Sequence, residues 1–403
     1  MLKIGIYLNI GSPEMGGAST LLNTIKKELK GAFNEYRFIV IYNGDGNQQY
    51  KVQSDGIDYI NLTSALKEVK WNIRFDKFRY MMKHPGLGDY YYGERDSVWE
   101  SIGKKEKLDL YWFTAPVIAY TSIPYIYTVW DLGHRVLPQF PEMSQPLSNW
   151  YGRENLYYRM LYRASYVITG NETGKKEILE NYLIPENKIR IVGFPISSFC
   201  YGEEKKPDFA LPDEYFFYPA QFWPHKNHIR IIEAVKILRD EYNTIVNVIF
   251  SGSDKGNRKY IEEMVNEYNL TTQVIFAGFV SYEEMKFLYT HANAMIFASL
   301  LGPNNMPPAE AAYLGCPVIL TDIPGHREQM GDTALYFDAC NSRDLAEKIL
   351  EIKDNRRLVE EIKEKENKFH HDMDNYSYSR EIIKIIQEFE LLRRTYGEEY
   401  TTR

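Results

Sequence analysis

Short apolar runs alternate with amphipathic segments along the whole chain. The runs are rich in β-branched and aromatic residues and stop at Gly, Pro, Asn or Asp, which is typical of buried strands. In the first half, strands are expected at 2–8, 36–42, 57–62, 109–113, 125–129, 166–169 and 188–192, and helices at 18–29, 150–164 and 171–183. Strands that alternate with helices predict an α/β fold with parallel sheets.

The alternation stops near the middle of the chain and then starts again. Residues 199–212 are polar and have no apolar period, which indicates a linker. Beyond it, strands are expected at 215–218, 246–251, 274–280, 294–299, 316–320 and 333–337, and helices at 229–239, 342–353, 356–369 and 376–394. The pattern predicts one domain over 1–198, a second over 213–375, and a final helical segment of about 376–403.

The stretch 300–328 carries the clearest local signals. After an expected strand, the sequence GPNN forms a loop that neither strand nor helix tolerates. Pro307 and Pro308 fit the first turn of a helix, and Gly315 is placed to end that helix before the next strand. In open α/β sheets, ligands bind at the carboxyl ends of strands. We therefore expect a ligand at this loop.

The residues of this loop suit a nucleotide. Backbone N–H groups near Asn305 and Met306, at the helix N-terminus, form an anion site. Glu310 does not suit an anion, but its carboxylate can accept two hydrogen bonds from a vicinal diol. Phosphates and a diol together describe a nucleotide. The alternative is that Glu310 only complements the helix dipole.

Composition narrows the class of protein. The 403 residues are 44% hydrophobic and 26% charged, with a net charge of −7, which argues against a nucleic-acid partner. Three scattered cysteines suit a reducing cytoplasm and give neither a disulfide framework nor a metal pair. No signal peptide or membrane span is evident, so we expect a cytoplasmic protein. The 33 tyrosines suit sugar-facing surfaces, although coding bias explains them equally well.

The segment GPNNMPPAEAAYLGCPVILTDIPG resembles the signature of the retaining glycosyltransferases of family 4, in the GPxNxPPxEA form of one branch. The resemblance implies a GT-B fold, in which two Rossmann-like, doubly wound parallel-sheet domains face each other across a cleft. It implies that the segment of about 376–403 packs back onto the first domain. Glu310 matches the family's second Glu, expected to hold the ribose hydroxyls, while Gly302 stands where the first Glu belongs.

The loop AQFWPHKNH resembles the family's diphosphate-binding loop. Lys226 matches a Lys that contacts the donor's diphosphate, and Gln221 stands where the family has an Arg. The Gly-rich turn at 11–17 corresponds to a turn beside the donor, and two further loops follow strands at the cleft. The expected donor-binding residues are Gly16, Gly17, Gln221, Lys226, Ser253, Phe279, Asn305, Met306, Pro307 and Glu310.

The first half offers candidates for the acceptor side. Asp131 and His134 follow an expected strand and can pair with each other or contact an acceptor hydroxyl. They resemble the family's His-Asp loop, with Trp130 in place of its first His. Asp131 is an acid/base or acceptor-positioning candidate, and a structural role at a helix start is the alternative. The basic and aromatic segment 66–93 is interpreted as a cleft-lining helix, with acceptor binding or contact with an anionic membrane as the alternative.

The resemblance implies a retaining, hexosyltransferase-type enzyme of bacterial-type polysaccharide or glycoconjugate assembly. The donor is a nucleoside diphosphate sugar, and the acceptor is a saccharide, lipid-linked or protein hydroxyl. The expected catalytic residues are Asp131, Lys226 and Glu310. No acidic cluster with metal-ligand spacing is evident, so neither metal nor cofactor is expected. Two alternatives are a catalytically impaired nucleotide-sugar-binding subunit and an epimerase or phosphorylase of the same fold.

Overall fold

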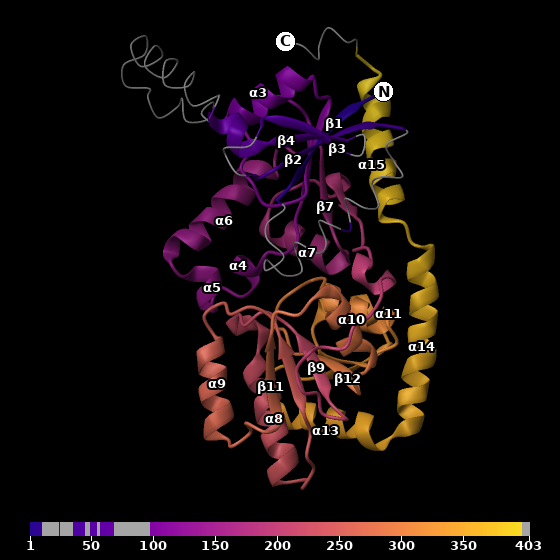
Figure 1. The fold of residues 1–403 in the computed structure, drawn as a ribbon. Coiled ribbons are helices and arrows are strands. Elements are labelled where there is room, and N and C mark those ends of the chain that lie inside the picture. Colours follow the sequence, from indigo (N-terminus) through magenta and orange to yellow (C-terminus); the bar gives the residue numbers. More distant parts are fainter. Residues whose placement is uncertain (10–23, 25–34, 45–48, 55–56, 68–96, 397–403) are drawn as a thin grey trace.

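A computed structural model describes residues 1–9, 24, 35–44, 49–54, 57–67 and 97–396. It shows two α/β domains, one above the other in Figure 1, each built around a sheet of its own. The candidates Gly16 and Gly17, the expected helix at 18–29 apart from Thr24, and nearly all of the segment 66–93 lie outside the described residues.

The first sheet has eight strands in the described part of the chain. The strands are β1 (Lys3–Leu8), β2 (Arg37–Tyr42), β3 (Lys51–Ser54), β4 (Ile57–Asn61), β5 (Leu110–Phe113), β6 (Tyr125–Thr128), β7 (Tyr166–Thr169) and β8 (Ile189–Ile191). Their order is β3-β4-β2-β1-β5-β6-β7-β8, and every pair is parallel except β3 with β4. The described helices of this domain are α3 (Ser97–Glu106), α4 (Gly133–Val136), α5 (Pro141–Ser144), α6 (Leu147–Met160) and α7 (Glu172–Asn181).

The second sheet is parallel throughout. Its strands are β9 (Phe216–Pro219), β10 (Val248–Ser251), β11 (Val274–Gly278), β12 (Ala294–Phe297), β13 (Val318–Thr321) and β14 (Ala334–Phe337). The order is β11-β10-β9-β12-β13-β14, so it reverses direction between β9 and β12. Such a reversal opens a crevice between the loops at the carboxyl ends of the two strands. The helices of this domain are α8 (His228–Asp240), α9 (Arg258–Glu267), α10 (Tyr282–Thr290), α11 (Met306–Tyr313), α12 (Pro324–Met330) and α13 (Ser342–Asp354).

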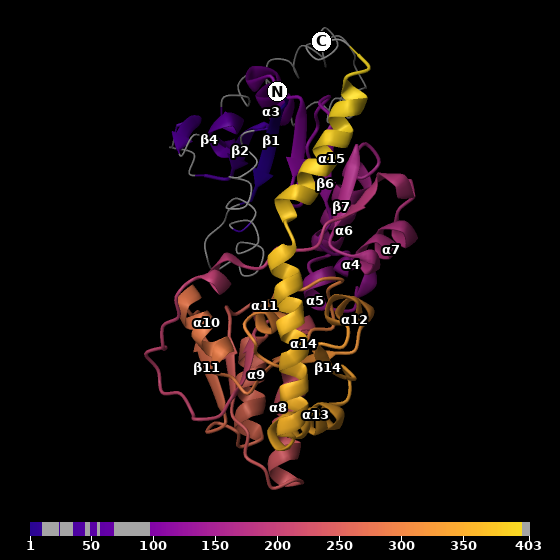
Figure 2. The same ribbon diagram turned by 90° about the vertical axis from the view of Figure 1, so that its right-hand side faces the viewer.

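Two consecutive helices run along both domains (Figure 2). α14 (Arg356–Asn375) lies against the second domain, and α15 (Tyr378–Arg393) returns to the first. Apolar residues of α15, among them Tyr378, Ile382 and Ile386, are buried with residues of the first sheet. Burial of this apolar face stabilises the return of the chain, and an ion pair of 2.6 Å between Arg190 and Glu388 adds to it.

The N-terminus of α7 joins the first domain to the second. The Glu328 carboxylate, on α12, accepts hydrogen bonds from the backbone N–H groups of Glu172 (2.6 Å) and Thr173 (2.7 Å) and from the Thr173 hydroxyl (2.6 Å). The side chain of Asn171 donates to the carbonyl oxygen of Pro303. A carboxylate at a helix N-terminus is favourable because it pairs with N–H groups that have no partner within the helix. The second domain therefore caps a helix of the first.

The strands expected from the apolar runs are present with shifts of one or two residues at their ends. β3 was not expected, because it is a short edge strand of mostly polar residues. The helices α3, α9 and α10 were not expected either. Within the described ranges, none of the helices combines the length and the apolar character needed to cross a membrane.

Candidate active site

A cavity of about 410 Å³ lies between the two domains. Its wall includes the loops that follow β9, β10, β11 and β12, which meet at the strand reversal of the second sheet. The first domain contributes Trp130, Asp131 and Phe194. The expected site residues on this wall are Asp131, Gln221, Lys226, Ser253, Phe279, Asn305, Met306, Pro307 and Glu310.

Lys226 is positioned by a short 3-10 helix, Pro224–Lys226, that precedes α8. Its ammonium group lies 3.2 Å from the Ser299 hydroxyl and 5.0 Å from the centre of the Phe297 ring. Burial lowers the pKa of Lys226 to about 8, although Asp131 and Glu142 oppose the shift. An ammonium group has three hydrogens. Because one serves Ser299, the others can serve an anion in the cavity.

Gln221 lies at the position of the missing arginine and is tied to its neighbours. Its amide nitrogen donates to the Ser253 hydroxyl at 3.0 Å, and its amide oxygen accepts from the indole N–H of Trp223 at 3.2 Å. The bond to Ser253 joins the loop after β9 to the loop after β10. The side chain adds no charge to the cavity, so Lys226 is the cation that this loop presents.

Glu310 is buried on α11 with 7% of its surface exposed. One carboxylate oxygen accepts a hydrogen bond from the Ser197 hydroxyl, and the other accepts one from the Tyr289 hydroxyl at 2.9 Å. Burial raises the pKa of Glu310, and these two hydrogen bonds oppose the rise. Each oxygen can accept a second bond. The carboxylate is thus held in one orientation with capacity left for two hydroxyl donors.

The N-terminus of α11 is poorer in free N–H groups than expected. The Asn305 N–H donates to the side-chain oxygen of Gln329 at 3.0 Å. Pro307 and Pro308 have no N–H, so Met306 and Ala309 supply the remaining donors of the first turn. The expectation that the Asn305 N–H holds an anion therefore needs correction. An anion in the cavity must therefore depend more on Lys226 for its neutralisation.

Asp131 follows β6, and its two carboxylate oxygens have different surroundings. Oδ1 accepts from the Gly133 N–H at 2.8 Å and lies 3.3 Å from the Arg153 guanidinium. Burial opposes ionisation, but Arg153 and the Gly133 N–H keep the pKa of Asp131 below its usual range. Oδ2 has no hydrogen-bond partner among the described residues. Asp131, which lines the cavity, therefore has one carboxylate oxygen that the protein holds and a second that no described residue holds.

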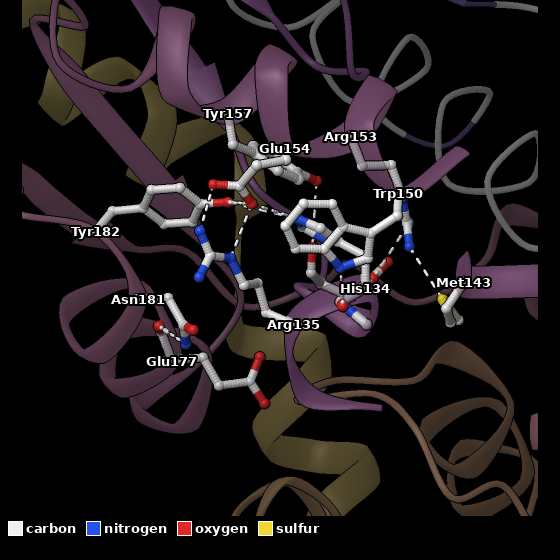
Figure 3. A network of polar contacts seen from close by, with 12 residues as sticks. His134, Arg135, Met143, Trp150, Arg153, Glu154, Tyr157, Glu177, Asn181 and Tyr182 are labelled. Carbon is white, nitrogen blue, oxygen red and sulfur yellow. Dashed lines mark hydrogen bonds and ion pairs between the residues drawn. The ribbon is translucent and has the colours of Figure 1, made fainter. Parts of the chain in front are cut away.

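His134 does not reach the cavity, which contradicts its assignment to the acceptor side. Its ring is fully buried and stacks on Tyr157, with Nε2 3.3 Å from a Glu154 oxygen. Figure 3 shows this network, in which Tyr182 also donates to Glu154 at 3.2 Å. Its position beside Asp131 in the sequence suggested a ligand contact, but the turn of α4 directs the ring inward. His134 is therefore a buried structural residue of the loop that carries Asp131.

His225, on the cavity wall, pairs with a residue that the sequence patterns did not reveal. His225 Nδ1 lies 2.5 Å from Glu142 Oε1, and the backbone N–H of His225 donates to the same oxygen at 3.0 Å. Glu142 belongs to α5 of the first domain, so the pair bridges the two domains beside Lys226. The two residues are 83 positions apart, and no local spacing signals the contact.

Comparisons with known proteins agree with this architecture. A sucrose-phosphate synthase from Thermosynechococcus elongatus has a TM-score of 0.73 at 16% identity, covering 98% of this chain and 100% of that chain. Anabaena HepE in complex with UDP and glucose has a TM-score of 0.67 at 15% identity, covering 96% of this chain and 100% of that chain. The chain has the GT-B fold. The predicted fold class is confirmed.

Sequence comparisons match part of the chain. Residues 202–369 match the family model described as Glycosyl transferases group 1. The O-antigen chain mannosyltransferase RfbU of Salmonella typhimurium is 31% identical over 193 residues, which are 46% of this chain and 51% of that relative. An uncharacterized glycosyltransferase of Methanocaldococcus jannaschii is 23% identical over 181 residues, 42% of this chain and 46% of that relative. The matched segment spans about half the length of these curated relatives.

The charged groups of this GT-B cavity do not form a recognisable metal site. Among the described residues, no group of three or more His, Cys, Asp or Glu side chains is placed to hold a metal ion. Asp131 and Glu310 are each engaged by protein hydrogen-bond donors. What the cavity offers is a cation, two oriented carboxylates and aromatic walls. That combination suits a hydroxylated anion.

Proposed function

We propose that this protein is a retaining hexosyltransferase that moves a sugar from a nucleoside diphosphate to an acceptor hydroxyl. The observation that carries the proposal is the presence of Lys226 and Glu310 on one cavity wall, at the strand reversal of the second sheet. A cation suits the diphosphate, and a buried carboxylate suits the ribose diol. The match to Glycosyl transferases group 1 and the names of the curated relatives support the same class.

In the proposed reaction, the bond between C1 of the sugar and the diphosphate oxygen breaks. A bond from C1 to the acceptor oxygen forms on the same face of the ring, and the acceptor's proton passes to the departing diphosphate. Negative charge develops on the leaving group, so stabilising it lowers the barrier. Lys226 supplies that stabilisation, assisted by the remaining N–H groups of the first turn of α11. No metal or cofactor takes part in this scheme.

The remaining residues bind the donor and the acceptor. Glu310 accepts hydrogen bonds from the ribose, and its Ser197 and Tyr289 partners keep it oriented. Gln221 and Ser253 contact the phosphates, while the turn at Phe279, whose side chain is 59% exposed, holds the base. Asp131 faces the acceptor with Oδ2. Because curated relatives include O-antigen chain mannosyltransferases, we infer that the acceptor is a saccharide in polysaccharide assembly.

The test is a transfer assay with purified protein and a panel of UDP-, GDP- and dTDP-hexoses. Release of nucleoside diphosphate is measured with and without a saccharide acceptor, and the product's anomeric configuration is read by NMR. We expect one nucleotide class to support turnover, with retained configuration and with activity unchanged by EDTA. Release of nucleoside diphosphate that no acceptor stimulates would contradict transfer to an acceptor hydroxyl. An inverted product would contradict the retaining mechanism, and EDTA inhibition reversed by Mg²⁺ would contradict the reaction without a metal.

A further inference from the structure

Gly302 and Asn305 occupy neighbouring places on the cavity wall. Gly302 has a φ of +130°, a conformation that favours glycine. A side-chain carbon at Gly302 would lie 2.3 Å from Nδ2 of Asn305 and 2.9 Å from its Oδ1. The amide of Asn305 therefore fills the space that a side chain at position 302 would take.

The orientation of that amide is determined by a buried histidine. His326 is fully buried on α12, and its Nδ1 lies 3.0 Å from the carbonyl oxygen of Thr321. A carbonyl oxygen only accepts, so Nδ1 carries a proton. The Thr321 hydroxyl is also 3.0 Å from Nδ1, but it donates its own hydrogen to the Ser299 carbonyl at 2.6 Å. Both neighbours of Nδ1 are thus acceptors.

The other ring nitrogen must then accept. Burial, with a smaller contribution from Lys226, lowers the pKa of His326 to about 4, although the hydrogen bond to the Thr321 carbonyl opposes the shift. The ring is neutral at pH 7 with its single proton on Nδ1, so Nε2 has only a lone pair. Nε2 lies 3.0 Å from the side-chain amide of Asn305, which must turn its NH₂ group toward it.

Both hydrogens of the Asn305 amide are used within the protein. One faces Nε2 of His326, and the other faces the carbonyl oxygen of Leu301 at 3.3 Å. The backbone of Asn305 is held by Gln329 at its N–H and at its carbonyl oxygen. Oδ1 has no hydrogen-bond donor in the part of the chain that the structure describes. It is an acceptor that this loop can offer to the cavity that Asn305 lines.

We propose that Asn305 Oδ1 accepts a hydrogen bond from a hydroxyl of the donor's sugar, and that His326 is the positioning residue that orients it. The inference rests on the proposed function. The chain of hydrogen bonds that orients Asn305 starts at Ser299, whose hydroxyl contacts Lys226. The Asn305 amide therefore lies on the loop beside the proposed diphosphate site. The group next to the diphosphate is the sugar. An uncharged oxygen favours a neutral, hydroxylated sugar over one that presents a carboxylate, because two acceptors repel each other.

The test compares Kd values of a nucleoside diphosphate and its sugar conjugate by calorimetry, using the pair that the wild-type protein binds. Asn305→Ala should weaken the sugar conjugate about three- to tenfold, the worth of one hydrogen bond, and leave the free nucleoside diphosphate within twofold. His326→Leu should cause the same selective loss, whereas His326→Gln, which retains an acceptor, should restore most of it. Asn266→Ala, on the exposed face of α9, is the matched control.

A deoxy donor identifies the hydroxyl. The wild-type protein should bind a donor that lacks the contacted hydroxyl about three- to tenfold more weakly than the complete donor. The Asn305→Ala protein should bind the two donors equally well. Equal weakening of both ligands, or weakening of neither, in a folded Asn305→Ala protein overturns the inference and leaves the proposed function standing. If the wild-type protein binds none of the nucleotide sugars, the proposed function fails, and this inference fails with it.

Discussion

Among single residues, Lys226 is the one on which the proposed reaction depends most. It is the side-chain cation that the loop after β9 directs at the cavity, because the corresponding arginine position is Gln221. Arg327 does not substitute for it. That side chain forms a bond of 2.7 Å with Asp322, stacks on Tyr336 and does not line the cavity. Within the described part of the chain, stabilisation of the charge on the departing diphosphate in the proposed reaction therefore depends mainly on this ammonium group.

Lys226→Ala should be much more harmful than Gln221→Ala. Removing one preorganised donor to developing charge costs about 10²–10³ in kcat, and a charged donor belongs at the upper end. Gln221 offers a neutral hydrogen bond, worth about 0.5–1.5 kcal/mol. The measurement is kcat at saturating donor for both variants, with circular dichroism to verify folding. Equal losses would show that another group neutralises the diphosphate.

Binding of a nucleoside diphosphate should weaken as the pH rises through 8. Lys226 has a lowered pKa of about 8 in the free protein, so it is charged below that pH and neutral above it. The bound anion favours the charged form, and each pKa unit of this preference corresponds to about tenfold in affinity. Calorimetry at pH 7 and pH 9.5 should show a Kd rise of about tenfold. Lys226→Arg should flatten the profile, because an arginine stays charged over this range; parallel profiles would exclude Lys226 as the titrating group.

The site residues were only partly predictable from the sequence, for a physical reason. Lys226 and Glu310 lie at fixed offsets from strand ends, so local pattern places them at the carboxyl edge of the second sheet. The partners that orient Glu310 were not predictable, since Ser197 is 113 positions away. For His134, proximity to Asp131 in the sequence was misleading, because a single helical turn separates exposed from buried directions.

At the scale of elements, the contact between α7 and α12 links the domains. Glu328 accepts three hydrogen bonds at the start of α7, and Pro303 of the cavity loop accepts one from Asn171. The loop that lines the cavity is therefore held to the first domain. The apolar runs predicted the strands on both sides, but not this contact, because polar pairs between domains follow no period.

Glu328→Ala should loosen this contact without unfolding either domain. Hydrogen bonds to a charged acceptor are worth about 1.5–3 kcal/mol, so hydrogen exchange at the amides of Glu172 and Thr173 should accelerate more than tenfold. Glu347→Ala, an exposed carboxylate on α13, is the matched control. Unchanged exchange at both amides would mean that Glu328 does not cap α7.

At the scale of the whole molecule, two doubly wound sheets form the two domains, and the helices α14 and α15 run along both of them (Figure 2). The apolar alternation predicted this architecture, because buried parallel strands leave a strong apolar signal. The cavity itself depends on both domains: Trp130 and Asp131 come from the first, Lys226 and Glu310 from the second. A nucleotide sugar between them can be held by one domain while the other presents the acceptor.

The most direct test of the proposed function is a crystal structure of the protein with the nucleoside diphosphate that it binds. We expect a phosphate oxygen at hydrogen-bond distance, about 2.7–3.2 Å, from Nζ of Lys226. We also expect both ribose hydroxyls at the carboxylate of Glu310, with the base near Phe279. A nucleotide bound outside the interdomain cavity, or one whose ribose and phosphates avoid Glu310 and Lys226, would contradict the proposed function.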